Sequence, residues 1–142
     1  MAKSDLSQAF DQLNEALTNV SREELTAAGE FVVSIISLRT KKGLDADGNA
    51  FTPYTRKYAQ WRQRKKLRMD KVDLTVTGHM LGAMVPVVTG DNEITVEFSG
   101  TKEIAKAVGN SRLRDFFDVR LERELDAIAD TVADGLIAEI LK

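Results

Sequence analysis

The sequence predicts an α+β fold in which several amphipathic helices pack against a small antiparallel β-sheet and a long helix ends the chain. Apolar residues recur at helical spacing near both ends of the 142-residue chain. Two short alternating segments in the middle are separated by a turn signal. No internal repeat or low-complexity linker interrupts the sequence. We therefore expect one domain over residues 1–142.

Two helices are expected in residues 1–42, where they would form a helical hairpin. Apolar side chains recur at steps of three and four from residue 5 to residue 20, which gives the first helix one apolar stripe. Ser21 followed by Glu24 has the spacing of a capping box, so a second helix should begin there. Its apolar face is wide, which predicts a central place in the core, and Gly43 should end it.

Residues 43–84 are expected to form a loop, a basic helix and a short helical turn. The loop contains an Asp45-x-Asp47-x-Asn49 pattern that is similar to the start of a calcium loop. Arg56 stands where the bidentate glutamate would fall, so a solvated turn is the better interpretation. The basic helix is predicted over residues 55–68.

The segment after the basic helix combines a short alternating run with a turn. Residues 73–77 alternate and are typical of a short strand. Thr77 and Gly78 then introduce the short helical turn, which contains Met80 and Leu81.

Residues 85–119 predict a β-hairpin, a short helix and an extended arm, and residues 120–142 the C-terminal helix. The hairpin strands are expected at 85–88 and 94–98, around the turn signal of residues 89–92. A short helix over residues 102–108 should stop at Gly109. Residues 111–119 alternate around Phe116 and are expected to add a strand or an extended arm.

Charge is divided unevenly along the chain although the net charge is only −2. Residues 1–38 carry a net charge of −4, residues 39–71 of +8 and residues 72–142 of −6. Such a division gives a molecule two unlike surfaces. One partner that fits is nucleic acid, and another is a second copy of the protein in head-to-tail contact.

Eight basic residues lie in segment 56–71, with Tyr58 and Trp61 among them. Aromatic residues interleaved with arginines are typical of a nucleic-acid surface. The alternatives are a helix that its aromatic residues anchor while the charges are solvated, or a protein-binding surface. Because the rest of the chain is acidic, we favour these alternatives over a DNA-binding role.

No set of residues indicates catalysis, so we expect no enzymatic activity, no cofactor and no metal. The chain has no cysteine and one histidine, His79, which is better explained as a packing or surface residue. Scattered carboxylates leave a metal-dependent hydrolase open as a third hypothesis. The N-terminus lacks a signal-peptide pattern and residues 31–38 are too short to span a bilayer. We therefore expect a soluble protein made in the cytosol, with no membrane partner.

The central block, read as PYT followed by DLT-x-TG-x-ML, resembles the small neck and tail-completion proteins of tailed phages, in the Mu-like virion morphogenesis and related head–tail joining families. Segment 111–117, SRLRDFF, resembles an element that precedes the final helix in that family. The close resemblance covers about a third of the chain, and the order of elements covers nearly all of it. The matching residues of the central block are Gly43, Asp47, Gly48, Phe51, Pro53, Tyr54, Thr55, Tyr58, Ala59, Leu74, Thr75, Thr77, Gly78, Met80 and Leu81.

The resemblance implies a structural protein of the virion neck or tail, assembled in the host cytoplasm, that joins the tail to the head. A hexameric ring is the expected form in the virion, and the free chain is compatible with a monomer. Its neighbours would be head-connector and tail-terminator or tail-tube proteins, with weak non-specific contact to DNA in the channel. We predict that the partner-contacting residues are Arg56, Arg62, Arg64, Lys65, Lys66 and Arg68, together with Phe51 and Tyr54.

Overall fold

The computed structural model describes Gln8 and residues 20–141, so the helix predicted over residues 5–20 lies almost entirely outside the described residues. The described part is an α+β arrangement with five helices and one two-stranded antiparallel sheet, as predicted. In chain order the elements are α2 (Arg22–Lys41), α3 (Arg56–Arg64), α4 (His79–Gly82), β1 (Met84–Gly90), β2 (Glu93–Phe98), α5 (Thr101–Ser111) and α6 (Glu122–Ile140).

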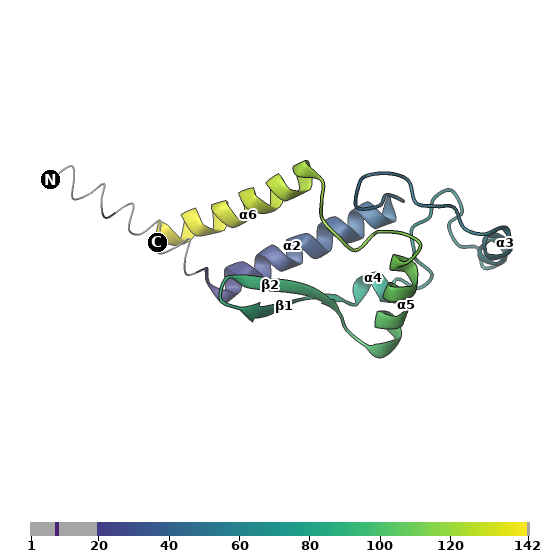
Figure 1. Ribbon diagram of the computed structural model, residues 1–142, viewed down its shortest axis with the longest axis horizontal. Coiled ribbons are helices and arrows are strands. Elements are labelled where there is room, and N and C mark those ends of the chain that lie inside the picture. The colour runs from purple at the N-terminus through teal and green to yellow at the C-terminus, as the bar shows by residue number, and fades with distance from the viewer. Residues whose placement is uncertain (1–7, 9–19, 142) are drawn as a thin grey trace.

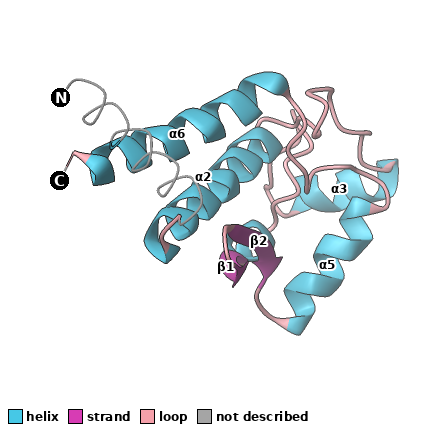
Figure 2. Cartoon of the chain, turned by 60° about the vertical axis from the view of Figure 1, so that its left-hand side comes forward, coloured by secondary structure: helices cyan, strands magenta, loops and turns pink. Residues whose placement is uncertain are grey.

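Helix α2 is the central element, as its wide apolar face predicted. It lies between the hairpin and α6 and contacts both (Figures 1 and 2). The Ser21 hydroxyl accepts a hydrogen bond from the Glu24 backbone N–H and so caps its start. At its end the Leu44 N–H donates to the Arg39 carbonyl and the Gly43 N–H donates to the Thr40 carbonyl, with Gly43 at φ +81°. This pair of bonds is a Schellman motif, which needs a left-handed residue that glycine adopts freely.

The hairpin pairs Met84 with Phe98 at one end and Val88 with Ile94 near its turn. Both strands extend further toward the turn than the sequence indicated, and the register shifts between Val88 and Gly90. The strands approach α2 closely at Gly29. A Cβ atom there would lie 2.5 Å from both Pro86 Cβ and Ile94 Cδ1. Only glycine therefore allows the helix and the sheet to pack at this separation.

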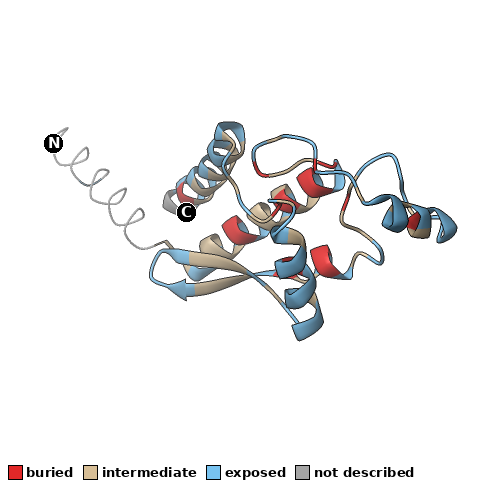
Figure 3. Cartoon of the chain, turned by 45° about the vertical axis from the view of Figure 1, so that its right-hand side comes forward, coloured by how far each residue is buried: buried red, intermediate tan, exposed pale blue. Residues whose placement is uncertain are grey.

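A compact apolar cluster joins α2, α4, the hairpin and the segment before α6. Ile36, Met80, Leu81 and Met84 are all buried in it, and Phe116 is fully buried. Buried segments concentrate around α2 and α4, whereas α3 is largely exposed (Figure 3). The predicted extended arm thus contributes core residues without forming a strand: within residues 112–121 the backbone contains no strand.

Arg39 ties this arm to α2 and α6. Its side chain is 4% exposed. It donates to a Glu124 carboxylate oxygen at 2.5 Å and to the carbonyls of Phe116 and Asp118 at 2.8 and 2.5 Å. Loss of either partner of this ion pair should destabilise the fold, because it leaves a buried charge uncompensated.

Two further sequence predictions are wrong in their details. Residues 73–77 form no strand, because the Asp73 carboxylate accepts the Thr75 N–H and Leu74 takes a left-handed φ of +54°. A side-chain hydrogen bond of this kind competes with strand pairing. The short helix expected to stop at Gly109 runs on to Ser111, because glycine tolerates a helical conformation where nothing else ends the helix.

Candidate functional site

Residues 52–75, which we call the basic lobe, project from one end of the molecule. They comprise α3 with the segments that lead into and out of it, and α3 stands apart from the other helices (Figure 1). The Thr55 hydroxyl accepts the Tyr58 N–H and caps the start of α3. No apolar side chain of the lobe is in the buried class, whereas Arg62 and Asp73 are, so polar contacts contribute much of what holds its shape.

Arg62 forms the interior of the lobe. Its side chain is 1% exposed. The guanidinium donates to the Arg68 carbonyl at 3.1 and 3.0 Å and to the Thr75 carbonyl at 2.9 Å, and it forms an ion pair with Asp73 at 3.3 Å. It also lies 4.8 Å from the ring centroid of Tyr54, within cation–π range. One arginine therefore joins three separate stretches of the lobe.

The lobe is closed where its two ends meet at Tyr54. The Tyr54 hydroxyl accepts a hydrogen bond from the Leu74 N–H at 3.2 Å. Burial raises the pKa of the Tyr54 phenol, and the neighbouring Arg62 guanidinium opposes that rise. Tyr54 also contacts Tyr58 edge to face, with ring centroids 4.9 Å apart.

Helix α3 ends earlier than predicted, at Arg64 instead of residue 68. The Leu67 N–H donates to the Arg62 carbonyl and the Lys66 N–H to the Gln63 carbonyl, which is the same Schellman pattern that ends α2. Here Lys66 takes the left-handed position, with φ +56°. A lysine does not indicate the end of a helix, so the sequence predicted a helix that continues beyond this position.

The exposed surface of the lobe is basic and mostly unpaired. Arg68 forms an ion pair with Asp70 at 2.7 Å, and this hydrogen bond lowers the pKa of the Asp70 carboxyl and raises that of Arg68. The remaining cations form no ion pair with any described carboxylate: Arg56, Lys57, Arg64, Lys65, Lys66 and Lys71. All six are exposed.

The structure separates the eight predicted contact residues into accessible and inaccessible groups. Arg56, Arg64, Lys65, Lys66 and Arg68 are exposed, and Tyr54 is half-buried. Phe51 and Arg62 are buried in this chain, Phe51 in the apolar cluster and Arg62 inside the lobe, so neither side chain is accessible to a partner here. The helical pattern of the sequence groups Arg62 with the exposed arginines. Such a pattern does not show which arginine pairs with a buried carboxylate and backbone carbonyls.

Arg114 holds the base of the lobe against the body, a role that no local pattern in the sequence predicts. It donates to the carbonyls of Thr52 and Pro53 at 3.0 and 3.3 Å, and its guanidinium lies 5.1 Å from the Tyr54 ring centroid. It belongs to the SRLRDFF segment, whose resemblance to a family element was the one available signal.

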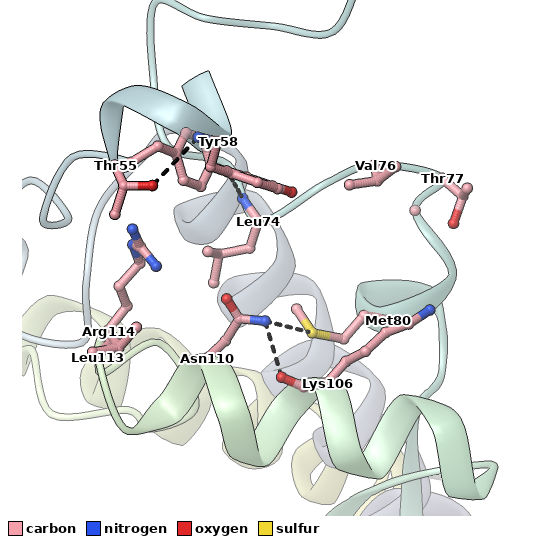
Figure 4. A pocket seen from close by; sticks show the side chains of 12 residues that line it. Thr55, Tyr58, Leu74, Val76, Thr77, Met80, Lys106, Asn110, Leu113 and Arg114 are labelled. Carbon is pink, nitrogen blue, oxygen red and sulfur yellow. Dashed lines mark hydrogen bonds between the residues drawn. The ribbon is translucent and has the colours of Figure 1, made fainter. Parts of the chain in front are cut away.

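A pocket of about 410 Å³ lies between the lobe, α4 and α5. Leu74, Met80 and Asn110 point toward one another in it, and Arg114 reaches up beside them (Figure 4). The Asn110 amide donates to the Lys106 carbonyl at 2.9 Å and to the Met80 sulfur at 3.6 Å. The walls are mainly apolar, so this pocket suits an apolar side chain better than a charged substrate.

The described residues contain no group of three or more histidine, aspartate or glutamate side chains placed to hold a metal ion. In the part of the chain that is described, no helix is both long and apolar enough to cross a membrane. No protein-family model, curated protein or solved structure matches the chain. The geometry of the basic lobe is therefore the main guide to function.

Proposed function

We propose that this protein is a structural component of a tailed-phage virion that completes the neck or tail and joins it to the head, and that it is not an enzyme. Its location would be the virion neck or tail, after assembly in the host cytoplasm. The partners would be further copies in a ring, expected to be hexameric, and neighbouring head-connector and tail-terminator or tail-tube proteins.

The observation that carries this proposal is the contact between the two halves of the family-like pattern. PYT contributes Tyr54, and DLT-x-TG-x-ML contributes Leu74, whose N–H donates to the Tyr54 hydroxyl. In the same pattern Thr55 caps α3, Gly78 takes a left-handed φ of +83° before α4, and Met80 enters the apolar cluster. Residues that resemble the family thus build one unit, which supports reading them as a single motif.

This unit presents a basic surface whose cations are mostly unpaired, which suits contact with an acidic partner. Charge complementarity at such a surface mainly raises the encounter rate and orients the partner. The experiment is deletion of the gene from the phage or prophage that carries it, with complementation from a plasmid. We expect separate heads and tails in electron micrographs and loss of infectious particles. A normal titre from the deletion would overturn the proposal.

The second candidate is a nucleic-acid-binding module that uses the basic 56–71 segment. The six unpaired cations favour it, as does the partly exposed Tyr58, whose ring stacks on Trp61 with ring centroids 5.4 Å apart. Such binding would show a log affinity that falls steeply with log salt concentration. A gel shift at low ionic strength decides this: absence of binding there eliminates the candidate.

A further inference from the structure

Helix α6 carries a row of carboxylates along its exposed side. Glu122, Asp126, Asp130 and Asp134, which we call the α6 acidic stripe, follow one another at intervals of four residues and are all exposed. Residues four apart lie on the same side of a helix, where like charges repel. Within the described part of the chain, none of the four carboxylates forms an ion pair.

The exposed side of α6 also presents apolar surface. Ile137 is 52% exposed and Leu141 80% exposed, and both follow Asp134 at helical spacing on the same side. Arg123 is the one exposed cation among the described residues of α6, so the net charge of this side remains negative. A partner for such a surface would be basic, with some apolar area of its own.

The basic lobe has these properties and matching dimensions. Lys57 and Arg64 lie seven residues apart on the exposed side of α3, and Asp126 and Asp134 lie eight apart on α6. Both spacings correspond to about 10–12 Å along a helix. Tyr58 is 36% exposed beside these cations, and Met69, further along the lobe, is 45% exposed.

The lobe and the stripe of one molecule cannot meet. In Figure 1 helix α3 lies at one end of the longest axis and α6 runs through the opposite half. Two complementary surfaces that lie this far apart in one molecule pair between molecules. A contact of this heterologous type leaves one unused surface at each end of the pair, so it adds further copies. The copies form a ring where the rotation between them closes and an open filament where it does not.

We propose that the basic lobe of one copy binds the α6 acidic stripe of a second copy. This inference rests on the proposed function, since it names the contact through which the ring would form. It places Lys57 and Arg64 of one copy opposite the carboxylates of Asp126, Asp130 and Asp134 of the other.

The test is sedimentation velocity of the full-length protein at millimolar concentration, at low and at high ionic strength. The lobe variant combines Lys57→Glu with Arg64→Glu, and the stripe variant combines Asp130→Lys with Asp134→Lys. The matched control combines Lys102→Glu on α5 with Arg112→Glu at the residue that follows α5, and it changes the net charge as the lobe variant does. All six positions are exposed, so circular dichroism and melting should show folded proteins.

We expect the wild-type protein and the control to form species larger than a dimer that dissociate at high salt. Each reversed variant alone should associate about tenfold or more weakly. Mixing the two reversed variants should restore association, because one pairing of their surfaces has the wild-type charges and the other has them exchanged. A mixture that stays monomeric, or reversed variants that associate like the wild type, would overturn the proposal.

Two other results also count against it. A wild-type protein that remains monomeric at low salt contradicts the contact directly. If the lobe variant loses binding to duplex DNA while self-association is unchanged, the partner of the lobe is nucleic acid. The proposed contact and the proposed function can be rejected independently. A normal titre after gene deletion rejects the proposed function, and only the association measurements test the contact.

Discussion

The guanidinium of Arg62 lies 4.8 Å from the ring centroid of Tyr54, and the two side chains hold the basic lobe together from inside. The Arg62 guanidinium donates to the Arg68 carbonyl and also to the Thr75 carbonyl and the Asp73 carboxylate, which belong to one later stretch of the lobe. Tyr54 joins the start of the lobe to its end at Leu74. An arginine that is buried in this way organises a protruding segment in which no apolar side chain is in the buried class. The accessible cations around it are then free to contact a partner.

Replacement of Arg62 by methionine should destabilise the lobe strongly. The change leaves the carbonyls of Arg68 and Thr75 without the arginine donor and the buried Asp73 carboxylate without its cation. This loss should cost about 2–3 kcal/mol. Denaturant unfolding and amide hydrogen exchange of residues 68–75 measure the loss. The control is Arg64→Met, on the exposed side of the same helix, which should change the unfolding free energy by less than about 0.5 kcal/mol. Equal effects of the two changes would contradict the structural role of Arg62.

Replacement of Gly29 by alanine should destabilise the protein although alanine favours a helix. The new methyl group would lie 2.5 Å from Pro86 and Ile94 across the α2–hairpin contact. Overpacking of this kind costs about 1–3 kcal/mol. The matched change is Gly109→Ala in α5, where no atom lies within 4 Å of the new Cβ. It should raise the free energy of unfolding by about 0.5–1 kcal/mol, because only helix propensity changes.

Replacement of Lys66 by glycine should stabilise the end of α3. Lys66 occupies a left-handed conformation that costs a side-chain-bearing residue about 1 kcal/mol, and glycine removes that cost at the expense of some unfolded-state entropy. The reverse change in the equivalent position of α2, Gly43→Ala, should destabilise, since Gly43 has φ +81°. Thermal unfolding of both variants tests the assignment. A Lys66→Gly variant that melts below the wild type would contradict it.

Tyr54 should make stability depend on pH in the alkaline range. Burial raises its pKa above the ordinary value of 10.0, so the folded state holds the phenol proton more tightly than the unfolded state. The contribution of Tyr54 to the free energy of unfolding is complete below pH 10.0 and is lost as the pH rises through the raised pKa.

The measurement for Tyr54 is the difference in unfolding free energy between the wild type and Tyr54→Phe, followed from neutral to alkaline pH. Taking the difference removes the titration of the lysines, which both proteins share. The difference should shrink as the pH rises above 10.0. A constant difference would show that the phenol has the same pKa in the folded and unfolded chains.

Sequence alone determined the elements whose signals are local. The helical spacing of apolar residues predicted α2 and α6, Ser21 and Gly43 predicted the ends of α2, and the turn signal predicted the hairpin. The separation of charge along the chain was equally visible, because it needs only a count of residues. These properties depend on neighbours within a few positions in the chain.

Tertiary structure decided which of the basic residues is buried, where α3 ends and how residues 73–77 fold. Arg62 meets Asp73 and Thr75 across turns of the chain, Leu74 donates to Tyr54 twenty residues away, and Arg114 clamps a loop more than sixty residues earlier. Periodicity carries no information on such pairings, since each depends on how distant segments are brought together. For that reason the surface available to a partner became visible only in three dimensions.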